Sequence, residues 1–478
     1  MAIKRFCFIG IFFMYGTLFA TESISGLSEY IEKTLEIFKV PGASVAVVVD
    51  DKVVLEQGFG TCQVGHDYPV TEKTLFSIGS CTKAFTAHLL GQLVDEKKLG
   101  WDDPVVTYLP EFAAVSSEIT IRDILAHRTG YLRHDPIWIF QDVAKEDLCI
   151  ILQSLSSTYP LGTQFTYNNL MYGVAGLVIE KLMGCSWEEA VTTRICVPLG
   201  MVDTVASNIQ NCPLGHADMR DTVTQVPNSP MSAIAPAGGI YSTLSDMVKW
   251  ATGHKTLLLP NTLQELYTIS MQAPAFDPLV EGYGLGWFVG TYHGHQLVGH
   301  SGTIQGYFAE LYMVPEKDIS IIILTNSSSD GVYAINCIRG ELLDRLLGLA
   351  PVDWIAKYAP IQAKAKQNIK HVTDTNTFIE NANDYCKTFA HPAYGTVTIS
   401  QEENRLYLTY GICKAQLTAK ETNIFTCEIP TLQMYGINPL VNITFKEDAT
   451  LLEIPFEGFR NSPPITFTEQ PNEPTTSI

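Results

Sequence analysis

Strand-like sequence on both sides of a long helical region is the feature that most constrains this fold. Two apolar runs, 44–49 and 52–57, flank a pair of aspartates and predict a β-hairpin early in the chain. Strand-like sequence returns between 296 and 325, whereas 101–255 carries mostly helical patterns broken by Gly/Pro loops. We therefore predict an α+β domain, with a mostly antiparallel sheet flanked by helices and an inserted helical subdomain.

Three helices of this domain have clear sequence signals. One begins near Ser80, carries apolar residues four apart, and is predicted to end at Gly100. Ser186 and Glu189 have the spacing of a capping box and open a second helix. A third, over 333–349, closes the domain, which we place at 21–350.

A change of composition after Pro351 predicts a second domain. The stretch 351–380 is polar, and we interpret it as a linker. Six short strand-like segments follow within 381–469, which predicts an all-β module, either a sandwich or a small barrel. The tail 470–478 has two prolines and no aromatic residue, so we expect it to be disordered.

The first 20 residues resemble a secretory signal peptide. Lys4 and Arg5 precede an apolar run that ends at Ala20, and this run is too short to span a bilayer as a helix. We expect cleavage after Ala20 and a secreted or periplasmic protein; the alternative is an uncleaved anchor, because bulky Leu18 occupies the usual small-residue place. No later apolar stretch is long enough to span a membrane, so we expect no stable membrane span after signal removal.

Composition excludes several classes of protein. Of 478 residues, 31 are Lys or Arg and 50 are Asp or Glu, and the net charge of -19 opposes nucleic acids and anionic membranes. Hydrophobic residues make up 46%, which excludes disorder for most of the chain. The eleven cysteines form no C-x-x-C pair, so most fit buried thiols, although some could pair in an oxidising compartment.

The predicted helix near Ser80 opens with Ser80-Cys81-Thr82-Lys83, an S-x-x-K tetrad. Residues three apart share one helix face, so Lys83 can reach the Ser80 hydroxyl. A serine hydroxyl becomes a strong nucleophile when a base removes its proton, and Lys83 can be that base if burial and the helix N-terminus lower its pKa. The alternative is a capping serine with a solvated lysine.

Two later motifs complete a candidate site. In Tyr167-Asn168-Asn169, a tyrosine can relay a proton and an amide can hold a substrate carbonyl; the alternative is a helix cap. His300-Ser301-Gly302-Thr303 lies at a predicted strand end, where backbone groups can bind an extended substrate or simply form a turn. His293 and His295 lie nearby, but no carboxylate or cysteine accompanies them to complete a metal site. We therefore predict no metal and no cofactor.

In this order, the three motifs resemble those of the serine β-lactamase and penicillin-binding-protein superfamily, S-x-x-K, Y-x-N and K-T-G. The likeness is strongest to the class C β-lactamase-related branch, which includes esterases and D-aminopeptidase-like hydrolases. It extends over about 27–349, and the module at 381–469 resembles the β-barrel-like domain often appended to these hydrolases. Four further stretches carry it: 121–130, 198–201, 237–242 and 283–287.

The resemblance implies a role for each motif. Ser80 is the acylated nucleophile, Lys83 and Tyr167 move its proton, and Asn169 orients the substrate. The stretch 300–303 binds substrate, and the N–H groups of Ser80 and Thr303 form an oxyanion hole. His300 departs from the family's lysine, and a neutral or half-charged imidazole holds a carboxylate less firmly.

We therefore expect an exported serine hydrolase that acts through an acyl-enzyme on a small-molecule or peptide substrate, either an ester, an amide or a D-amino-acid peptide. The alternative is a penicillin-binding-like or non-catalytic ligand-binding protein with poor turnover. Oligomeric state does not follow from the sequence.

Overall fold

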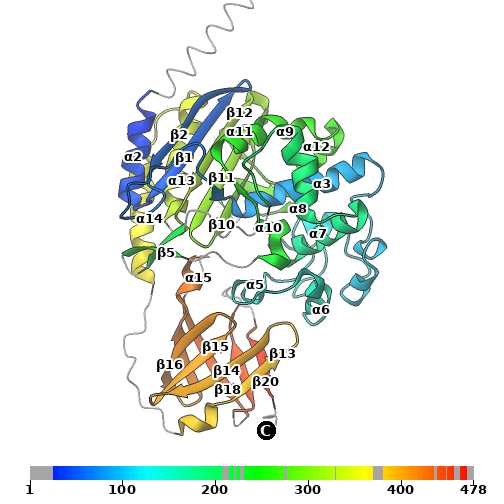
Figure 1. Ribbon diagram of the computed structural model, residues 1–478, viewed down its shortest axis with the longest axis vertical. Helices are drawn as coiled ribbons and strands as arrows, with labels where there is room; N and C mark the ends of the chain where they lie inside the picture. The colour runs from blue at the N-terminus through cyan, green and yellow to red at the C-terminus, as the bar shows by residue number, and fades with distance from the viewer. Residues whose placement is uncertain are drawn as a thin grey trace, which may run out of the picture.

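The computed structural model describes residues 25–206, 215–219, 222–226, 231–273, 277–328, 330–369, 381–434, 439–447, 449–456 and 463–470. The expected signal peptide, 1–20, lies outside the described residues, as do all but the first residue of the expected disordered tail and most of the second half of the expected linker. Figure 1 shows a larger N-terminal domain with a β-barrel below it.

The N-terminal domain is built on an eight-stranded antiparallel sheet with the order β2-β1-β12-β11-β10-β9-β8-β7. Its first hairpin turns at Asp50 and Asp51, both with positive φ, and pairs with a late strand through Val45 and Ile323. The strands are β1 Gly42–Val49, β2 Lys52–Gly60, β7 Met271–Gln272, β8 Val280–Tyr283, β9 Phe288–Tyr292, β10 His295–Ile304, β11 Tyr307–Val314 and β12 Ile319–Thr325. The α+β prediction is confirmed, with both ends of the domain sharing one sheet.

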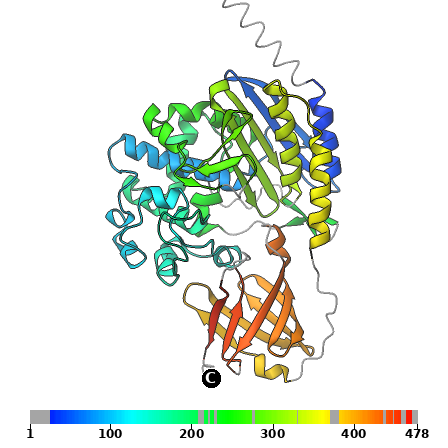
Figure 2. The same cartoon turned by 180° about the vertical axis from the view of Figure 1, so that it is seen from behind.

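Helices cover both faces of this sheet, which is why β11 and β12 are buried along their whole length. Three helices lie on one face (Figure 2): α2 Leu27–Phe38, α13 Gly331–Leu346 and α14 Trp354–Asn368. The last of these occupies part of the stretch interpreted as a linker, because Trp354 packs on α13 and its indole donates to Asp344 at 2.8 Å.

The other face carries the inserted helical subdomain. Its helices are α3 Thr82–Asp95, α4 Ile121–Leu125, α5 Pro136–Ile139, α6 Leu148–Gln153, α7 Asn169–Met183, α8 Trp187–Val191, α9 Val197–Leu199, α10 Ala235–Gly238, α11 Leu244–Gly253 and α12 Pro260–Leu266. Ser186 caps α8 as predicted, accepting from Glu189 N at 3.1 Å. The prediction that α3 ends at Gly100 is wrong, since the helix ends at Asp95 and Lys97 takes positive φ.

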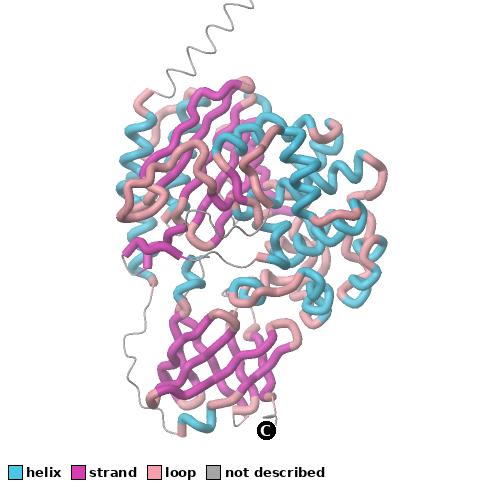
Figure 3. Tube along the Cα trace, in the orientation of Figure 1, coloured by secondary structure: helices cyan, strands magenta, loops and turns pink. Residues whose placement is uncertain are grey.

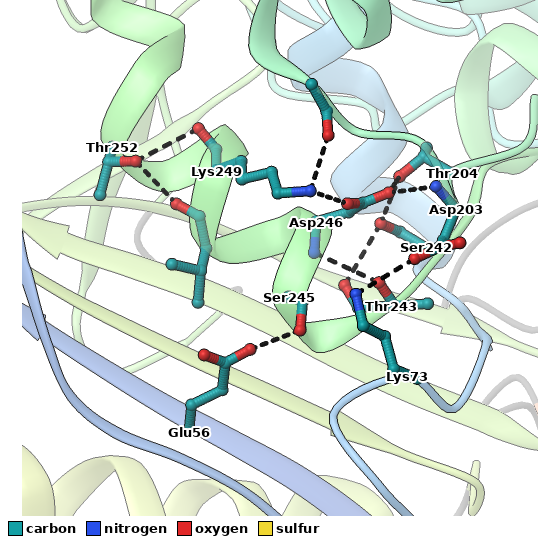
Figure 4. A network of polar contacts seen from close by, with 12 residues as sticks. Glu56, Lys73, Asp203, Thr204, Ser242, Thr243, Ser245, Asp246, Lys249 and Thr252 are labelled. Atoms are coloured by element: carbon teal, nitrogen blue, oxygen red, sulfur yellow. Dashed lines mark hydrogen bonds and ion pairs between the residues drawn. The ribbon is translucent and has the colours of Figure 1, made fainter.

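A buried carboxylate joins the start of α11 to the loop beside it (Figure 4). Asp246 accepts from Asp203 N at 2.7 Å, Thr204 Oγ1 at 2.9 Å and Lys249 Nζ at 2.8 Å. Thr204 also bonds Ser242 Oγ at 2.8 Å, in strand β6 (Tyr241–Ser242). Because β6 pairs with β3 (Phe76–Ser77), this network fixes the segment that leads directly into Ser80.

The C-terminal module is a closed eight-stranded antiparallel barrel (Figure 3). Its elements are β13 Thr388–His391, β14 Gly395–Glu402, β15 Arg405–Tyr410, β16 Cys413–Glu421, β17 Ile424–Glu428, α15 Pro430–Met434, β18 Leu440–Lys446, β19 Leu451–Ile454 and β20 Ile465–Glu469. Strands β13 and β20 were not predicted, and their pairing closes the barrel. The structure thereby decides between the sandwich and the barrel.

Strands β7 and β8 of the main sheet were not predicted. Nor was the hairpin of β4 (Gly215–Met219) and β5 (Thr222–Val226), which lies within the helical region. Ala217 and Val226 of this hairpin pack against Met434 of α15, so the hairpin contacts the barrel domain. Among the described residues, no helix is long and apolar enough to cross a membrane.

Candidate active site

Ser80 lies in a single 3₁₀ turn, Gly79–Cys81, that leads into α3. Its side chain is half-buried, whereas Lys83, one turn later, is fully buried. Lys83 Nζ lies 3.0 Å from Ser80 Oγ, so the tetrad's two side chains meet as predicted. Burial of Lys83 excludes the alternative of a solvated lysine.

Lys83 Nζ has two further neighbours that can only accept hydrogen bonds from it. It donates to Asn169 Oδ1 and to Ala237 O, both at 2.8 Å. A neutral amine has two protons and one lone pair. When those two acceptors take both protons, the lone pair is left for the Ser80 hydroxyl, so this arrangement suits Lys83 to act as a base.

The surroundings of Lys83 favour its neutral form. Burial lowers the pKa of Lys83 well below its ordinary value, and the nearby cation Arg133 lowers it further. The carboxylate of Asp135 acts in the opposite direction and raises the same pKa.

The ring of Tyr167 lies over the amine of Lys83. Lys83 Nζ is 4.7 Å from the centre of the Tyr167 ring, and the Tyr167 hydroxyl hydrogen-bonds Ser80. Burial raises the pKa of Tyr167, so it remains a protonated phenol that can pass a proton on. The guanidinium of Arg133 covers the ring, with Cζ 4.9 Å from its centre.

The two asparagines after Tyr167 have different roles, one as a helix cap and one in the site. Asn168 caps α7 by accepting from Met171 N at 3.0 Å. Asn169, the first residue of α7, turns inward to Lys83. The alternative of a helix cap is therefore correct for Asn168 and not for its neighbour.

Strand β10 brings the third motif against the serine. A Cβ built on Gly302 would lie 2.0 Å from Ile78 O and 2.7 Å from Ser80 N, so only a glycine fits here. Gly79, with a φ of 48°, faces the same strand, and a Cβ built on it would lie 3.1 Å from Thr303 N. Ser301 and Thr303, on either side of Gly302, are half-buried.

The imidazole of His300 is buried and neutral. Its Nδ1 donates to Ser301 O at 2.6 Å, so Nε2 accepts from the Tyr283 hydroxyl at 2.7 Å. Burial lowers the pKa of His300 to about 3, and Lys83 lowers it too. Of the two charge states considered from the sequence, the structure favours the neutral one, so His300 places no cation at this point of β10.

Motif reasoning missed Asp135, which belongs to this cluster. Asp135 accepts from Asn169 Nδ2 at 3.0 Å and from Arg133 Nε at 2.5 Å. It belongs to none of the three motifs, and only its place at the end of an Arg- and Asp-rich loop flanked by histidines could have pointed to it. His127 packs on Tyr167 with ring centres 4.2 Å apart, and the stretch 121–130 that contains it was already part of the resemblance.

The described residues hold no group of three or more His, Cys, Asp or Glu side chains placed for a metal. His293 lies in the turn before β10, so it does not share a strand face with His295. The nine described cysteines are free thiols; one, Cys81, is buried beside the serine and donates to His300 O at 3.2 Å.

Comparison with known proteins agrees with this geometry. Residues 27–343 match the family model described as Beta-lactamase. The chain is 30% identical to the unguisins hydrolase ungD' of Aspergillus campestris, over 80% of this chain and 78% of that protein. It is 26% identical to penicillin-binding protein 4 of Amycolatopsis lactamdurans, over 65% of this chain and 87% of that protein.

Solved structures share the fold. An octameric penicillin-binding protein homologue from Pyrococcus abyssi superposes with a TM-score of 0.62 at 23% identity, over 93% of this chain and all of that chain. D-amino acid amidase from Ochrobactrum anthropi SV3 covers 68% of this chain and 98% of its own, with a TM-score of 0.59 at 24% identity. The chain therefore belongs to the β-lactamase family of serine hydrolases, in its class C-like branch related to penicillin-binding proteins.

Proposed function

We propose that the protein hydrolyses an ester or amide bond through an acyl-enzyme on Ser80. The observation that carries this proposal is the set of three polar neighbours of Lys83 Nζ at 2.8–3.0 Å, which directs one lone pair at the Ser80 hydroxyl. A second support is the naming of relatives as hydrolases of unguisins, at 30% and 28% identity.

In the acylation step, Lys83 takes the Ser80 proton as Oγ attacks the substrate carbonyl carbon. The N–H groups of Ser80 and Thr303 would receive the oxyanion, a contribution of about 3 kcal/mol for one such donor. The proton then passes, with the help of Tyr167, to the leaving amine or alcohol as the C–N or C–O bond breaks. Water attacks the acyl-enzyme in the same way, which releases the acid and restores Ser80.

The charge of the site favours some substrates over others. His300 is neutral and buried, so it offers a substrate carboxylate less attraction than an ammonium group would. We infer that the substrate is an ester, an amide or a D-amino-acid peptide, with an uncharged group beside β10. Asn169 retains one amide proton for the substrate, because Asp135 uses the other.

A fluorophosphonate probe tests the nucleophile. We expect one adduct on the peptide that contains Ser80, and none in the Ser80→Ala variant. Ser77→Ala is the matched control, since Ser77 is three residues earlier and 1% exposed. An adduct on another serine, or full activity of folded Ser80→Ala, would contradict the mechanism.

Turnover of a chromogenic ester separates a hydrolase from a ligand-binding protein of the same fold. We expect many product molecules per enzyme; one stoichiometric burst alone would favour the binding protein. A screen of esters, D-amino-acid amides and a β-lactam would then identify the substrate class.

Export is part of the proposal. The basic start and short apolar run of residues 1–20 support a cleaved signal peptide and a secreted or periplasmic location. We expect the mature chain to begin near Thr21, which N-terminal sequencing of secreted or periplasmic material checks. An intact Met1 in that fraction would contradict cleavage.

A further inference from the structure

The segment 133–141, which we call the strap, lies between the acylation site and the barrel. It contains α5, and Figures 1 and 2 both show this helix at the end of the barrel nearest the N-terminal domain. One end of the strap contacts Tyr167 and Asn169 through Arg133 and Asp135. The strap therefore connects the barrel directly to the site.

Asp135 decides which way the Asn169 amide faces. An asparagine amide has a donor end and an acceptor end, and the two can exchange places by rotation. Asp135, 2% exposed, can only accept as a carboxylate, and it bonds Asn169 Nδ2 at 3.0 Å. That contact directs Asn169 Oδ1 to Lys83 Nζ, 2.8 Å away. A rotated amide would place N–H groups against the amine and remove one of its two acceptors.

The barrel contacts His134, the residue next to Asp135. The hydroxyl of Tyr394, a fully buried barrel residue, lies 2.7 Å from His134 Nδ1. His134 has a φ of 50°, a left-handed conformation that a non-glycine residue keeps only when its surroundings hold it.

The barrel also holds the far end of the strap. Gln141 Nε2 donates to Tyr394 O at 2.9 Å and to the Tyr410 hydroxyl at 2.6 Å. Ile412 N donates to Phe140 O at 2.9 Å. A Cβ built on Gly411 would lie 1.9 Å from Phe140 O, so the barrel loop approaches the strap as closely as a glycine permits.

We propose that Asp135 is a positioning residue that fixes the Asn169 amide toward Lys83, and that the C-terminal barrel holds Asp135 in place by binding the strap. The proposal rests on the acyl-enzyme function proposed above. It assigns the barrel a part in the chemistry of the other domain, although no barrel residue is placed at the reacting atoms.

The test measures the rate of fluorophosphonate labelling in the full chain for Asp135→Asn and Tyr394→Phe. We expect Asp135→Asn to label on the order of 100-fold more slowly, the loss typical of a misplaced catalytic group. Tyr394→Phe removes one hydroxyl and should slow labelling about fivefold, as for one lost hydrogen bond. The matched control is Tyr385→Phe, which removes a 2.6 Å bond to Asn423 within the barrel and should label like wild type.

A double variant and a pH profile separate positioning from a general loss of structure. Asp135→Asn with Tyr394→Phe should be no slower than Asp135→Asn alone, because both act on one contact. The carboxylate of Asp135 raises the pKa of Lys83, so its removal should move the acid limb of the labelling rate to lower pH. The other titratable or charged groups around Lys83 remain in this variant: Cys81, His127, Arg133, Tyr167, Tyr172 and His300.

The outcomes are distinct. Wild-type labelling rates in both single variants, additive losses in the double variant, or an unmoved acid limb would overturn the inference while leaving the proposed function intact. An unlabelled wild-type protein would instead contradict the proposed function itself. Circular dichroism of each variant shows that the rates compared are those of folded protein.

Discussion

Around Ser80 the N-terminal domain buries polar and charged side chains, whereas the interior of the barrel is apolar. Lys83 and Asn168 are fully buried, and Asp135 and His300 nearly so. Among the described barrel residues, no charged, amide or Ser/Thr side chain is buried to this extent. Buried polar groups depend on specific partners, while an apolar interior depends on volume and packing. Substitutions in the first region should therefore change chemistry, and those in the barrel interior away from the strap should change stability.

The largest effect should come from Lys83→Ala. Loss of the base should lower the hydrolysis rate by about 10⁴-fold or more, and combination with Ser80→Ala should add little, because nucleophile and base act as a unit. Steady-state rates with a chromogenic ester provide the measurement. Multiplicative losses in the double variant would contradict joint action.

In the barrel, Leu406→Ala should lower stability without changing the hydrolysis rate. Leu406 is fully buried opposite Leu417, so its truncation should lower the free energy of unfolding by about 2–5 kcal/mol. The hydrolysis rate per folded molecule should not change. Urea unfolding and rate measurements at one temperature check both, with Thr409→Ala on the same strand as the control. A slower rate in folded Leu406→Ala would extend the barrel's influence beyond the strap.

Within the site, Gly302→Ala tests how closely β10 must approach Ser80. A methyl group 2.0 Å from Ile78 O must push β10 away from Ser80, which should slow hydrolysis on the order of 100-fold. Gly238→Ala, whose added methyl would have no neighbour closer than 3.8 Å, should be close to wild type. Equal rates for the two variants would show that the close approach of β10 is not needed.

The smallest expected effect is on how stability depends on pH, through the buried imidazole of His300. The pKa of His300 is about 3 in the folded protein against 6.5 ordinarily, so the unfolded chain binds more protons between these values. His300 therefore stabilises the fold above pH 6.5, and this contribution is lost as pH falls toward 3, by at most about 1.4 kcal/mol per pH unit.

Urea unfolding at several pH values between about 7 and about 4, within the window set by these two pKa values, measures this slope. The slope should be smaller in His300→Gln than in wild type. It should be unchanged in His66→Gln, which replaces an exposed histidine. Parallel slopes in wild type and His300→Gln would show that the imidazole takes up its proton without unfolding.

Local pattern was sufficient wherever a structural role depends on neighbours in sequence. The hairpin at 44–57, the Ser186 cap and most of the barrel strands follow from alternation, turn residues and side-chain spacing. The S-x-x-K spacing likewise placed Lys83 beside Ser80, since a helical turn fixes that distance. Resemblance to a known family then joined the three motifs into one site, which periodicity alone could not do.

Only the tertiary structure decided what surrounds those motifs. Asp135 and Ala237 reach Lys83 or Asn169 from segments far away in the chain, and no short pattern encodes such a contact. Burial, which favours the neutral forms of His300 and Lys83, is likewise a property of the packed molecule. The barrel's hold on the strap has the same origin: Tyr394 meets His134 across 260 residues of chain, because folding brings the two domains together.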